Sequence, residues 1–267
     1  MFNRANRNSR RAFAARAVAL LAAMLVAGPA QADDVQVADA DADEAELVLV
    51  AGATGRTGRE IVVGLQANGY RVRAFVRDTE KARELLGDGI EFAEGDVRER
   101  ATIDAALVGV SAIISAIGAG RSDPDNGPEF VDYGGVRNLA EAAASAELRQ
   151  VVLVSSGGVT QEDHILNKMF NNVLRWKFKG EEALRDSGVP YTIIRPGGLV
   201  DKPAGEANVV FSQGDTESGS IPRADLARVC VAALGTPDAL NKTLEANSGK
   251  SALAQNIADL FAALAVD

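Results

Sequence analysis

The chain has 267 residues, of which 47% are hydrophobic and 24% are charged, and this composition fits one α/β domain with a full-sized core. Its formal net charge of −9 argues against nucleic acid or anionic lipid as a partner of the general surface. With one cysteine and one histidine, the sequence offers no intrachain disulfide and no histidine-rich metal site.

Residues 1–32 are basic and apolar and contain no acid, which predicts a targeting peptide. The segment from Ser9 to Phe13, SRRAF, resembles the twin-arginine motif S-R-R-x-F, and Ala30-Gln31-Ala32 is an A-x-A cleavage site. The resemblance implies that the twin-arginine export machinery carries the folded, cofactor-loaded protein to the periplasm. It implies no stable membrane insertion after the peptide is removed. Arginine-rich, acid-free segments are also typical of organellar transit peptides, plastid or mitochondrial, so this alternative stays open.

Residues 33–46 carry seven acids and few apolar side chains, a composition that predicts a solvated, disordered linker. We therefore expect the folded domain to occupy residues 47–267.

A glycine motif follows the first apolar run of this domain. Leu47–Ala51 is predicted to form a strand, residues 52–58 read GATGRTG, and a helical pattern with Ile61, Val62 and Leu65 on one face comes next. Glycine permits the sharp turn and a close approach of backbone to a pyrophosphate, whose charge the free N–H groups of the helix start complement. The motif predicts a dinucleotide site that contains Gly52, Thr54, Gly55, Arg56, Thr57 and Gly58.

The second predicted strand, Tyr70–Val76, ends in Arg77-Asp78. An acid at this position binds the ribose 2′-hydroxyl of NAD, whereas an arginine accommodates the 2′-phosphate of NADP. Arg77 comes first, and Arg56 lies near the same phosphate in related folds. The sequence therefore favours NADP over NAD. Asp78 is an acid that could bind the 2′-hydroxyl of NAD, but a role as the cap of the helix Thr79–Leu86 also explains it.

The third and fourth strands are expected at Ile90–Glu94 and Ala112–Ser115. In related folds, the residues at the positions of Asp96 and Val97 flank the adenine. Small residues after the fourth strand, Ala116 and Gly118 among them, leave room for the nicotinamide ribose.

Helices and strands continue to alternate. Helices are predicted at Phe130–Ala146 and Leu166–Ser187, and strands at Gln150–Ser156 and Tyr191–Pro196. This alternation predicts a doubly wound parallel sheet, the Rossmann fold, in a single domain with its ligands at the carboxyl ends of the strands. The remaining residues are expected to form a small segment on the substrate side, with strands at Val209–Phe211 and Lys242–Asn247 and a helix at Ala252–Ala265.

The G-x-x-G-x-x-G spacing resembles the short-chain dehydrogenase/reductase superfamily, whose members use a Ser, a Tyr and a Lys in Y-x-x-x-K spacing. Ser155 fits the serine and Lys179 the lysine, but Arg175 stands where the tyrosine would be. An arginine stays protonated and cannot replace the phenol. Lys179 is therefore expected to bind the ribose more than to catalyse, and Tyr133 is interpreted as a packing residue.

The segments VAGATGRTG, FVRD, EGDV, VDYGGVRNL, VVLVSSGG, YTIIRPGGLVDK and IPRADLARVC together resemble the atypical short-chain dehydrogenases/reductases. Within that class they are similar to the NAD(P)H-binding group of plant NADP-binding and plastid-translocon-associated Rossmann proteins. Flavin reductase-like and NmrA-like proteins are more distant kin. The resemblance implies NADP(H) binding and places Pro196 and Gly197 beside the nicotinamide.

Two functions fit these observations. The first is an NADP-dependent oxidoreductase whose small acceptor, such as a flavin, quinone or tetrapyrrole, needs no tyrosine as proton donor. The alternative is a non-catalytic NADP(H)-binding protein that senses redox state or binds a partner.

Overall fold

The computed structural model describes residues 45–120, 126–251 and 255–267. The chain divides into a unit from Met1 to Ala40 and a unit from Asp41 to Asp267, and the described residues belong to the second. The predicted targeting peptide over residues 1–32 and all but the last two residues of the predicted linker over residues 33–46 lie outside the described residues.

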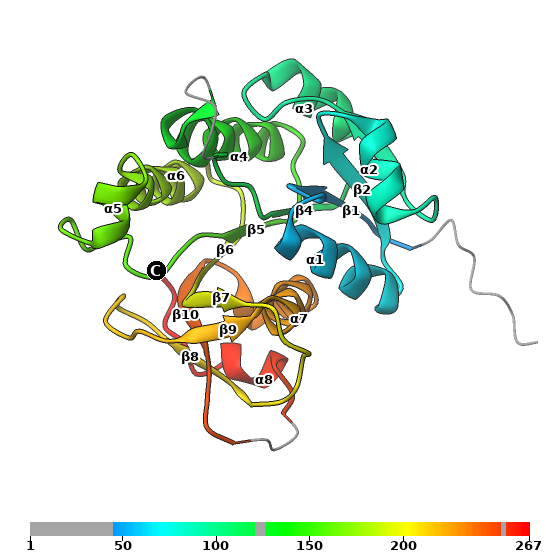
Figure 1. The fold of residues 1–267 in the computed structure, drawn as a ribbon. Coiled ribbons are helices and arrows are strands. Elements are labelled where there is room, and N and C mark those ends of the chain that lie inside the picture. Colours follow the sequence, from blue (N-terminus) through cyan, green and yellow to red (C-terminus); the bar gives the residue numbers. More distant parts are fainter. Residues whose placement is uncertain (1–44, 121–125, 252–254) are drawn as a thin grey trace, which may run out of the picture. The chain divides into compact units, whose positions relative to one another are not determined.

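An eight-stranded sheet forms the centre of the second unit (Figure 1). Its strand order is β3-β2-β1-β4-β5-β6-β10-β8, and neighbours are parallel except for β8, which runs antiparallel to β10. In that order the strands are Glu91–Glu94, Arg71–Val76, Leu47–Ala51, Ala112–Ser115, Gln150–Val154, Tyr191–Pro196, Lys242–Ser248 and Val209–Ser212. The order reverses between β1 and β4, so the carboxyl ends of these two strands mark the point where ligands bind in such sheets.

Helices cover both faces of the sheet (Figure 1). One face carries α1 (Arg56–Ala67), α2 (Thr79–Leu86), α7 (Arg223–Leu234) and α8 (Ala258–Phe261), and the other carries α3 (Arg100–Ala106), α4 (Val136–Ser145) and α6 (Val173–Asp186). The shorter elements are the π-helix η2 (Glu129–Gly135), α5 (Ile165–Met169), the 3₁₀ helix η3 (Pro237–Ala239) and the parallel pair β7 (Gly198–Val200) and β9 (Ser220–Pro222).

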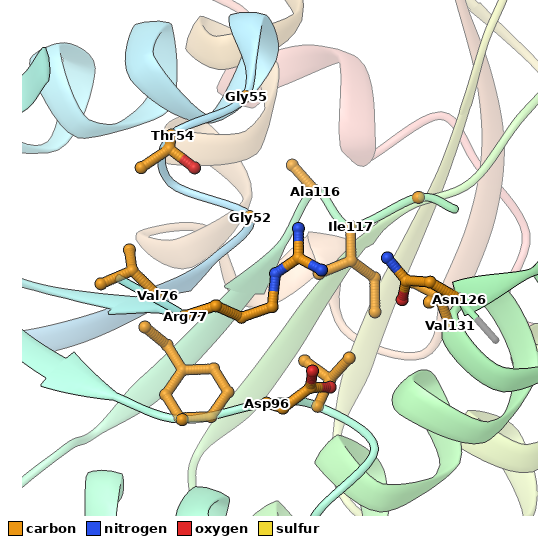
Figure 2. A pocket seen from close by; sticks show the side chains of 14 residues that line it. Gly52, Thr54, Gly55, Val76, Arg77, Asp96, Ala116, Ile117, Asn126 and Val131 are labelled. Atoms are coloured by element: carbon orange, nitrogen blue, oxygen red, sulfur yellow. The ribbon is translucent and has the colours of Figure 1, made fainter. Parts of the chain in front are cut away.

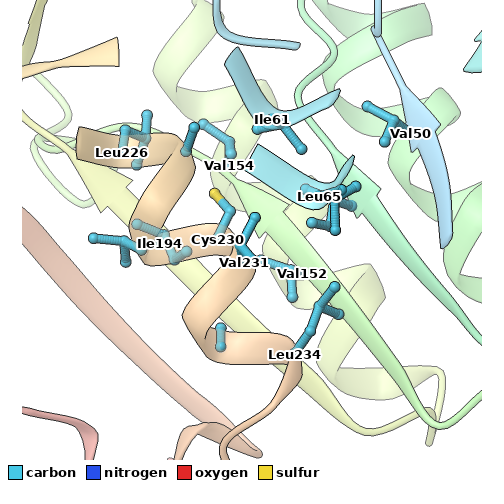
Figure 3. Packing of buried hydrophobic residues seen from close by; sticks show 14 of the residues in the cluster. Val50, Ile61, Leu65, Val152, Val154, Ile194, Leu226, Cys230, Val231 and Leu234 are labelled. Carbon is cyan, nitrogen blue, oxygen red and sulfur yellow. The ribbon is translucent and has the colours of Figure 1, made fainter. Parts of the chain in front are cut away.

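Strand side chains alternate between two hydrophobic layers because successive residues of a strand point to opposite faces. Val48 and Val50 belong to the layer under α1 and α7, whereas Leu49 belongs to the layer under α4 and α6. In the first layer, Cys230 packs near Ile61 (Figure 3) and is fully buried. Burial raises the pKa of its thiol to about 12, which makes Cys230 a packing residue.

The predicted fold class is confirmed, although several elements differ. In the described part of the chain, the predicted helix Ala252–Ala265 is helical only over Ala258–Phe261, and the predicted helix Phe130–Ala146 begins as the π-helix η2. The sheet is not wholly parallel, because β8 adds an antiparallel edge strand. The helix predicted over Leu166–Ser187 is broken into α5 and α6, because Asn171 and Asn172 adopt left-handed conformations with φ of 48° and 58°. Asparagine tolerates this conformation better than most residues, and the break sets which side chains of α6 face the sheet.

Candidate functional site

The glycine turn joins β1 to α1. Gly52 has φ of +82°, and a Cβ there would lie 2.7 Å from the carbonyl oxygen of Ala116. A Cβ at Gly58 would overlap the carbonyl oxygen of Gly52 and lie 2.8 Å from the Cα of Ala53. No side chain caps the start of α1 at Gly55. These two glycines therefore keep the turn close to β4, and the helix presents free N–H groups where an anion can bind.

A cavity of about 240 Å³ opens at the carboxyl ends of β1, β2, β3 and β4. Figure 2 shows the glycine turn on one side and the residues after β2 and β3 on the other. The predicted site residues that line it are Gly52, Thr54, Gly55, Arg77, Asp96, Val97, Ala116 and Gly118. The structure adds Phe75, Val76, Gly95, Ile117, Asn126 and Val131. One cavity thus brings together residues of four strand ends, as the predicted position of a nucleotide requires.

The carboxylate of Asp96 is engaged by its neighbour Arg98. The backbone N–H and Nε of Arg98 each donate to Oδ1 at 2.9 Å, and Nη2 donates to Oδ2 at 2.7 Å. These hydrogen bonds hold the pKa of the Asp96 carboxyl below its ordinary value. The predicted contact of Asp96 with the adenine amine stays a prediction, and both oxygens already have donors.

Arg77 lines the cavity next to a second hollow. That hollow shares Thr54, Val76 and Arg77 with the first and adds Asp78 and, from the first turn of α2, Lys81. Within the described ranges, neither Arg77 nor the Lys81 side chain forms an ion pair, since Asp78 accepts instead from the backbone N–H of Lys81 at 2.9 Å. Asp78 is therefore the helix cap, and two cations face the open hollow.

Arg56 does not line either hollow. Its Nη1 lies 3.0 Å from Oδ2 of Asp201, and Arg223 pairs with Oδ1 of the same carboxylate. The side chain of Arg56 thus reaches from α1 to Asp201 on the loop after β7, and Arg56 does not line the hollows that Arg77 lines. Thr57 and Gly58 lie in the first turn of α1, outside the lining of the cavity.

Ser155 is also differently placed from the prediction. Its hydroxyl donates to Oε1 of Glu181 at 2.6 Å, and Glu181, which is fully buried, accepts from Nε and Nη2 of Arg195 at 3.0 and 2.7 Å. The geometry therefore uses Ser155 in a buried polar network between β5, β6 and α6, and not at the open cavity.

Lys179 and Lys177 point in different directions from α6. Lys179 stacks over Trp176 at 4.6 Å and lines a separate hollow with Tyr133, itself stacked on Trp176. Lys177 turns inward, with Nζ 2.8 Å from Oδ1 of Asp132. The structure therefore does not bring Lys179 to the cavity.

Asp132 connects Lys177 to the end of β4. Its Oδ2 accepts from the N–H of Ala119 at 3.0 Å, and Oδ1 faces the cavity residue Gly118. Gly180 lets α6 approach this point, because a Cβ there would overlap the carbonyl oxygen of Asp132. Sequence analysis missed both Lys177 and Asp132. Lys177 shares one face of a helix with the residues Leu174, Glu181 and Leu184, because they are spaced three or four positions apart. This spacing could have shown that Lys177 turns inward.

Pro196 and Gly197 close the end of β6. The carbonyl oxygen of Pro196 accepts from the N–H of Gly157 at 2.9 Å, and Gly197 packs against Oδ1 of Asn247 with no space for a Cβ. The residues after β5 and β6 are thus tied together, although they do not line the cavity of Figure 2.

Fold and cavity together define a Rossmann protein built to hold a nucleotide. Residues 52–237 match a protein family described as NAD(P)H-binding, and the chain belongs to this family, among the proteins related to the atypical short-chain dehydrogenases/reductases.

Curated relatives cover most of the chain. An uncharacterized chloroplastic protein of Arabidopsis thaliana is 39% identical over 235 residues, or 79% of this chain and 72% of that protein. Sanguinarine reductase of Eschscholzia californica is 35% identical over 250 residues, or 78% of this chain and 91% of that protein. The chloroplastic protein TIC 62 of Pisum sativum is 38% identical, but the matched part is only 38% of its length.

Solved structures share the fold. A putative NAD-dependent epimerase/dehydratase from Bacillus halodurans has a TM-score of 0.72 and 25% identity, and the match covers 82% of this chain and all of that one. ChuY, an anaerobillin reductase from Escherichia coli O157:H7, has a TM-score of 0.66 and 24% identity over 79% of this chain. The fold thus agrees with the family match, and the sequence identity to sanguinarine reductase makes the protein an NAD(P)H-binding relative of a reductase.

The predicted export to the periplasm is wrong. Relatives whose names state a compartment are chloroplastic, which contradicts the twin-arginine signal and the export machinery as a partner, and favours the organellar alternative. The error has a physical reason, because both kinds of peptide are basic, acid-free and weakly apolar, so that composition did not separate them.

Among the residues that the structure describes, no group of three His, Cys, Asp or Glu side chains could hold a metal ion. The same residues include no helix long and apolar enough to cross a bilayer.

Proposed function

We propose that the protein binds NADP(H) in this cavity and reduces a small acceptor that needs no tyrosine as proton donor. The observation that carries the proposal is the cavity itself, which joins a glycine turn without space for side chains to two cations without ion-pair partners in the described chain. When bound, the nicotinamide supplies the hydride. The protein's own residues orient the cofactor and leave room for the acceptor.

The cofactor preference rests on Arg77 and Lys81. Both line the hollow beside Thr54, and a phosphate placed there would gain two charge-assisted hydrogen bonds that a hydroxyl cannot match. These features support NADP over NAD.

Replacing Arg77 by Ala should therefore weaken NADPH binding far more than NADH binding. Loss of one hydrogen bond between charged groups, worth about 1.5–3 kcal/mol, corresponds to a decrease of about 10- to 100-fold. Lys81→Ala should act in the same direction with a smaller effect, since Lys81 reaches only the second hollow. Titration calorimetry measures the dissociation constants of NADPH and NADH for the wild-type chain and both variants. Equal losses for NADPH and NADH would contradict the assignment.

Lys177 is proposed for the role first predicted for Lys179. Asp132 holds its ammonium beside Gly118 at the end of β4, where the nicotinamide ribose would lie in a Rossmann fold. An ammonium at this position can donate to ribose hydroxyls.

Lys177→Gln should weaken NADPH binding about tenfold and lower reductase turnover, whereas Lys179→Gln should change neither by more than about twofold. The two lysines lie on the same helix, so the second variant is a matched control for charge and helix propensity. Fluorescence titration and steady-state rates with a panel of flavins, quinones and aldehydes provide the readouts. A larger loss of binding and turnover in Lys179→Gln than in Lys177→Gln would instead assign the ribose contact to Lys179.

A non-catalytic role is the second candidate. It is favoured by the lack of a tyrosine four residues before either lysine, where Val173 and Arg175 stand, and by the engagement of Ser155 with buried Glu181. Tight NADPH binding without oxidation by any acceptor of the panel would support this role and contradict the proposed reduction.

The chloroplastic relatives support an organellar location, and we propose that residues 1–32 direct it and that residues 47–267 form the cofactor-binding domain. Import of a reporter fused to residues 1–46 into isolated plastids tests the first proposal, and retained NADPH binding by residues 47–267 alone tests the second. Failure of either would remove that part of the proposal.

A further inference from the structure

Asn126 is a buried polar residue that the motifs do not explain. Only 8% of its surface is exposed, and it lines the cavity opposite the glycine turn. Figure 2 shows its amide reaching into the same space as the guanidinium of Arg77. Across the described residues, no hydrogen-bond partner of the amide is present. The amide therefore opens onto the cavity, where its oxygen and its two N–H groups are available to a molecule that enters.

Apolar side chains surround Asn126. Ile117 and Val131 lie at the same end of the cavity in Figure 2, and Val97, which also lines the cavity, meets Ile117 at Gly135. These side chains form surfaces suited to the faces of a planar ring. This end therefore fits an aromatic base better than a phosphate or a sugar, which would need more polar partners.

The other polar group at this end is already engaged. Asp96 accepts three hydrogen bonds from Arg98, whereas the Asn126 amide has one acceptor oxygen and two N–H donors to offer. An asparagine amide matches the adenine edge, where an exocyclic amine donates beside a ring nitrogen that accepts. The chemistry of the two residues thus assigns recognition of the base to the amide.

We propose that Asn126 recognises the adenine base of the cofactor through paired hydrogen bonds from its side-chain amide. The inference rests on the proposed NADP(H) binding and goes beyond it. It names the residue that distinguishes adenine from a base whose amine and neighbouring ring nitrogen are modified.

The test compares NADP with its 1,N6-ethenoadenine analogue, in which a two-carbon bridge occupies the amine and the adjacent ring nitrogen. The full chain should bind NADP about tenfold or more tighter than the analogue, because the bridge removes the amine hydrogens and the paired hydrogen bonds cannot form. Asn126→Ala removes the amide and makes room for the bridge, so its two dissociation constants should agree within about threefold. Asn68→Ala, on the exposed end of α1, is the control and should keep the wild-type ratio.

The outcomes separate the two proposals. If the wild-type chain binds NADP and Asn126→Ala keeps the full discrimination, the role of Asn126 is overturned and the proposed function stands. If the wild-type chain binds neither compound, the proposed function fails together with this inference. Thermal melting of each variant shows that the compared proteins are folded.

Discussion

Gly58→Ala should abolish measurable NADP(H) binding and destabilise the protein. The added Cβ would overlap the carbonyl oxygen of Gly52 and lie 2.8 Å from the Cα of Ala53, and both neighbours are backbone atoms that no rotamer change can move. The turn must therefore shift, which displaces the N–H groups at the start of α1. Loss of two hydrogen bonds to a charged phosphate, each worth about 1.5–3 kcal/mol, corresponds to binding weaker by about a hundredfold or more.

The same substitution should lower the free energy of unfolding by about 1–3 kcal/mol, as expected for overpacking. Gly89→Ala is the matched control, because its Cβ would meet only the flexible side chain of Gln66, at 3.4 Å. Urea unfolding and calorimetry on both variants provide the measurements. Wild-type affinity in Gly58→Ala would show that the turn does not hold the phosphates.

Glu181→Ala should cause the largest loss of stability. Glu181 is fully buried and carries hydrogen bonds from Ser155, Arg185 and Arg195. Its removal would leave the guanidinium of Arg195, itself only 6% exposed, without its main anion. Breaking a buried ion pair in this way costs about 3–5 kcal/mol, which lowers the melting temperature of a domain of this size by about 10 °C.

Glu182→Ala is the control for Glu181→Ala. It changes the same residue type one position along α6, but Glu182 is exposed, so the melting temperature should move by less than about 2 °C. Differential scanning calorimetry compares the two variants. Similar melting temperatures for both would mean that the buried network contributes little to stability.

The fold could be predicted because its signals are local. Gly52 and Gly58 mark a turn that only glycine can form at this distance from β4, and Tyr191–Pro196 and Thr79–Leu86 were predicted with the bounds that the structure has. Alternating strands and helices then leave few arrangements for the sheet. The end of β2 identified Arg77 for the same reason, since the carboxyl ends of neighbouring parallel strands meet at one edge.

The substrate side could not be predicted as well, because it depends on rotation and on contacts between distant segments. Two residues along an α-helix are separated by about 200° around its axis, so placing the start of α6 correctly decides whether Lys177 or Lys179 turns inward. The break at Asn171 and Asn172 was not recognised. Ser155 matched a catalytic position in sequence, but its partner Glu181 lies 26 residues away. Asn126 belongs to the sequence RSDPDNGP over residues 121–128, whose composition indicates no role.

Titration calorimetry of the full chain with NADPH, NADH and buffer alone decides whether the cavity holds a nicotinamide cofactor. We expect saturable binding of NADPH, with a weaker signal for NADH, because the glycine turn receives the pyrophosphate of both whereas Arg77 and Lys81 favour only the phosphorylated ribose. A folded protein that binds neither cofactor would show that the cavity is not a nucleotide site.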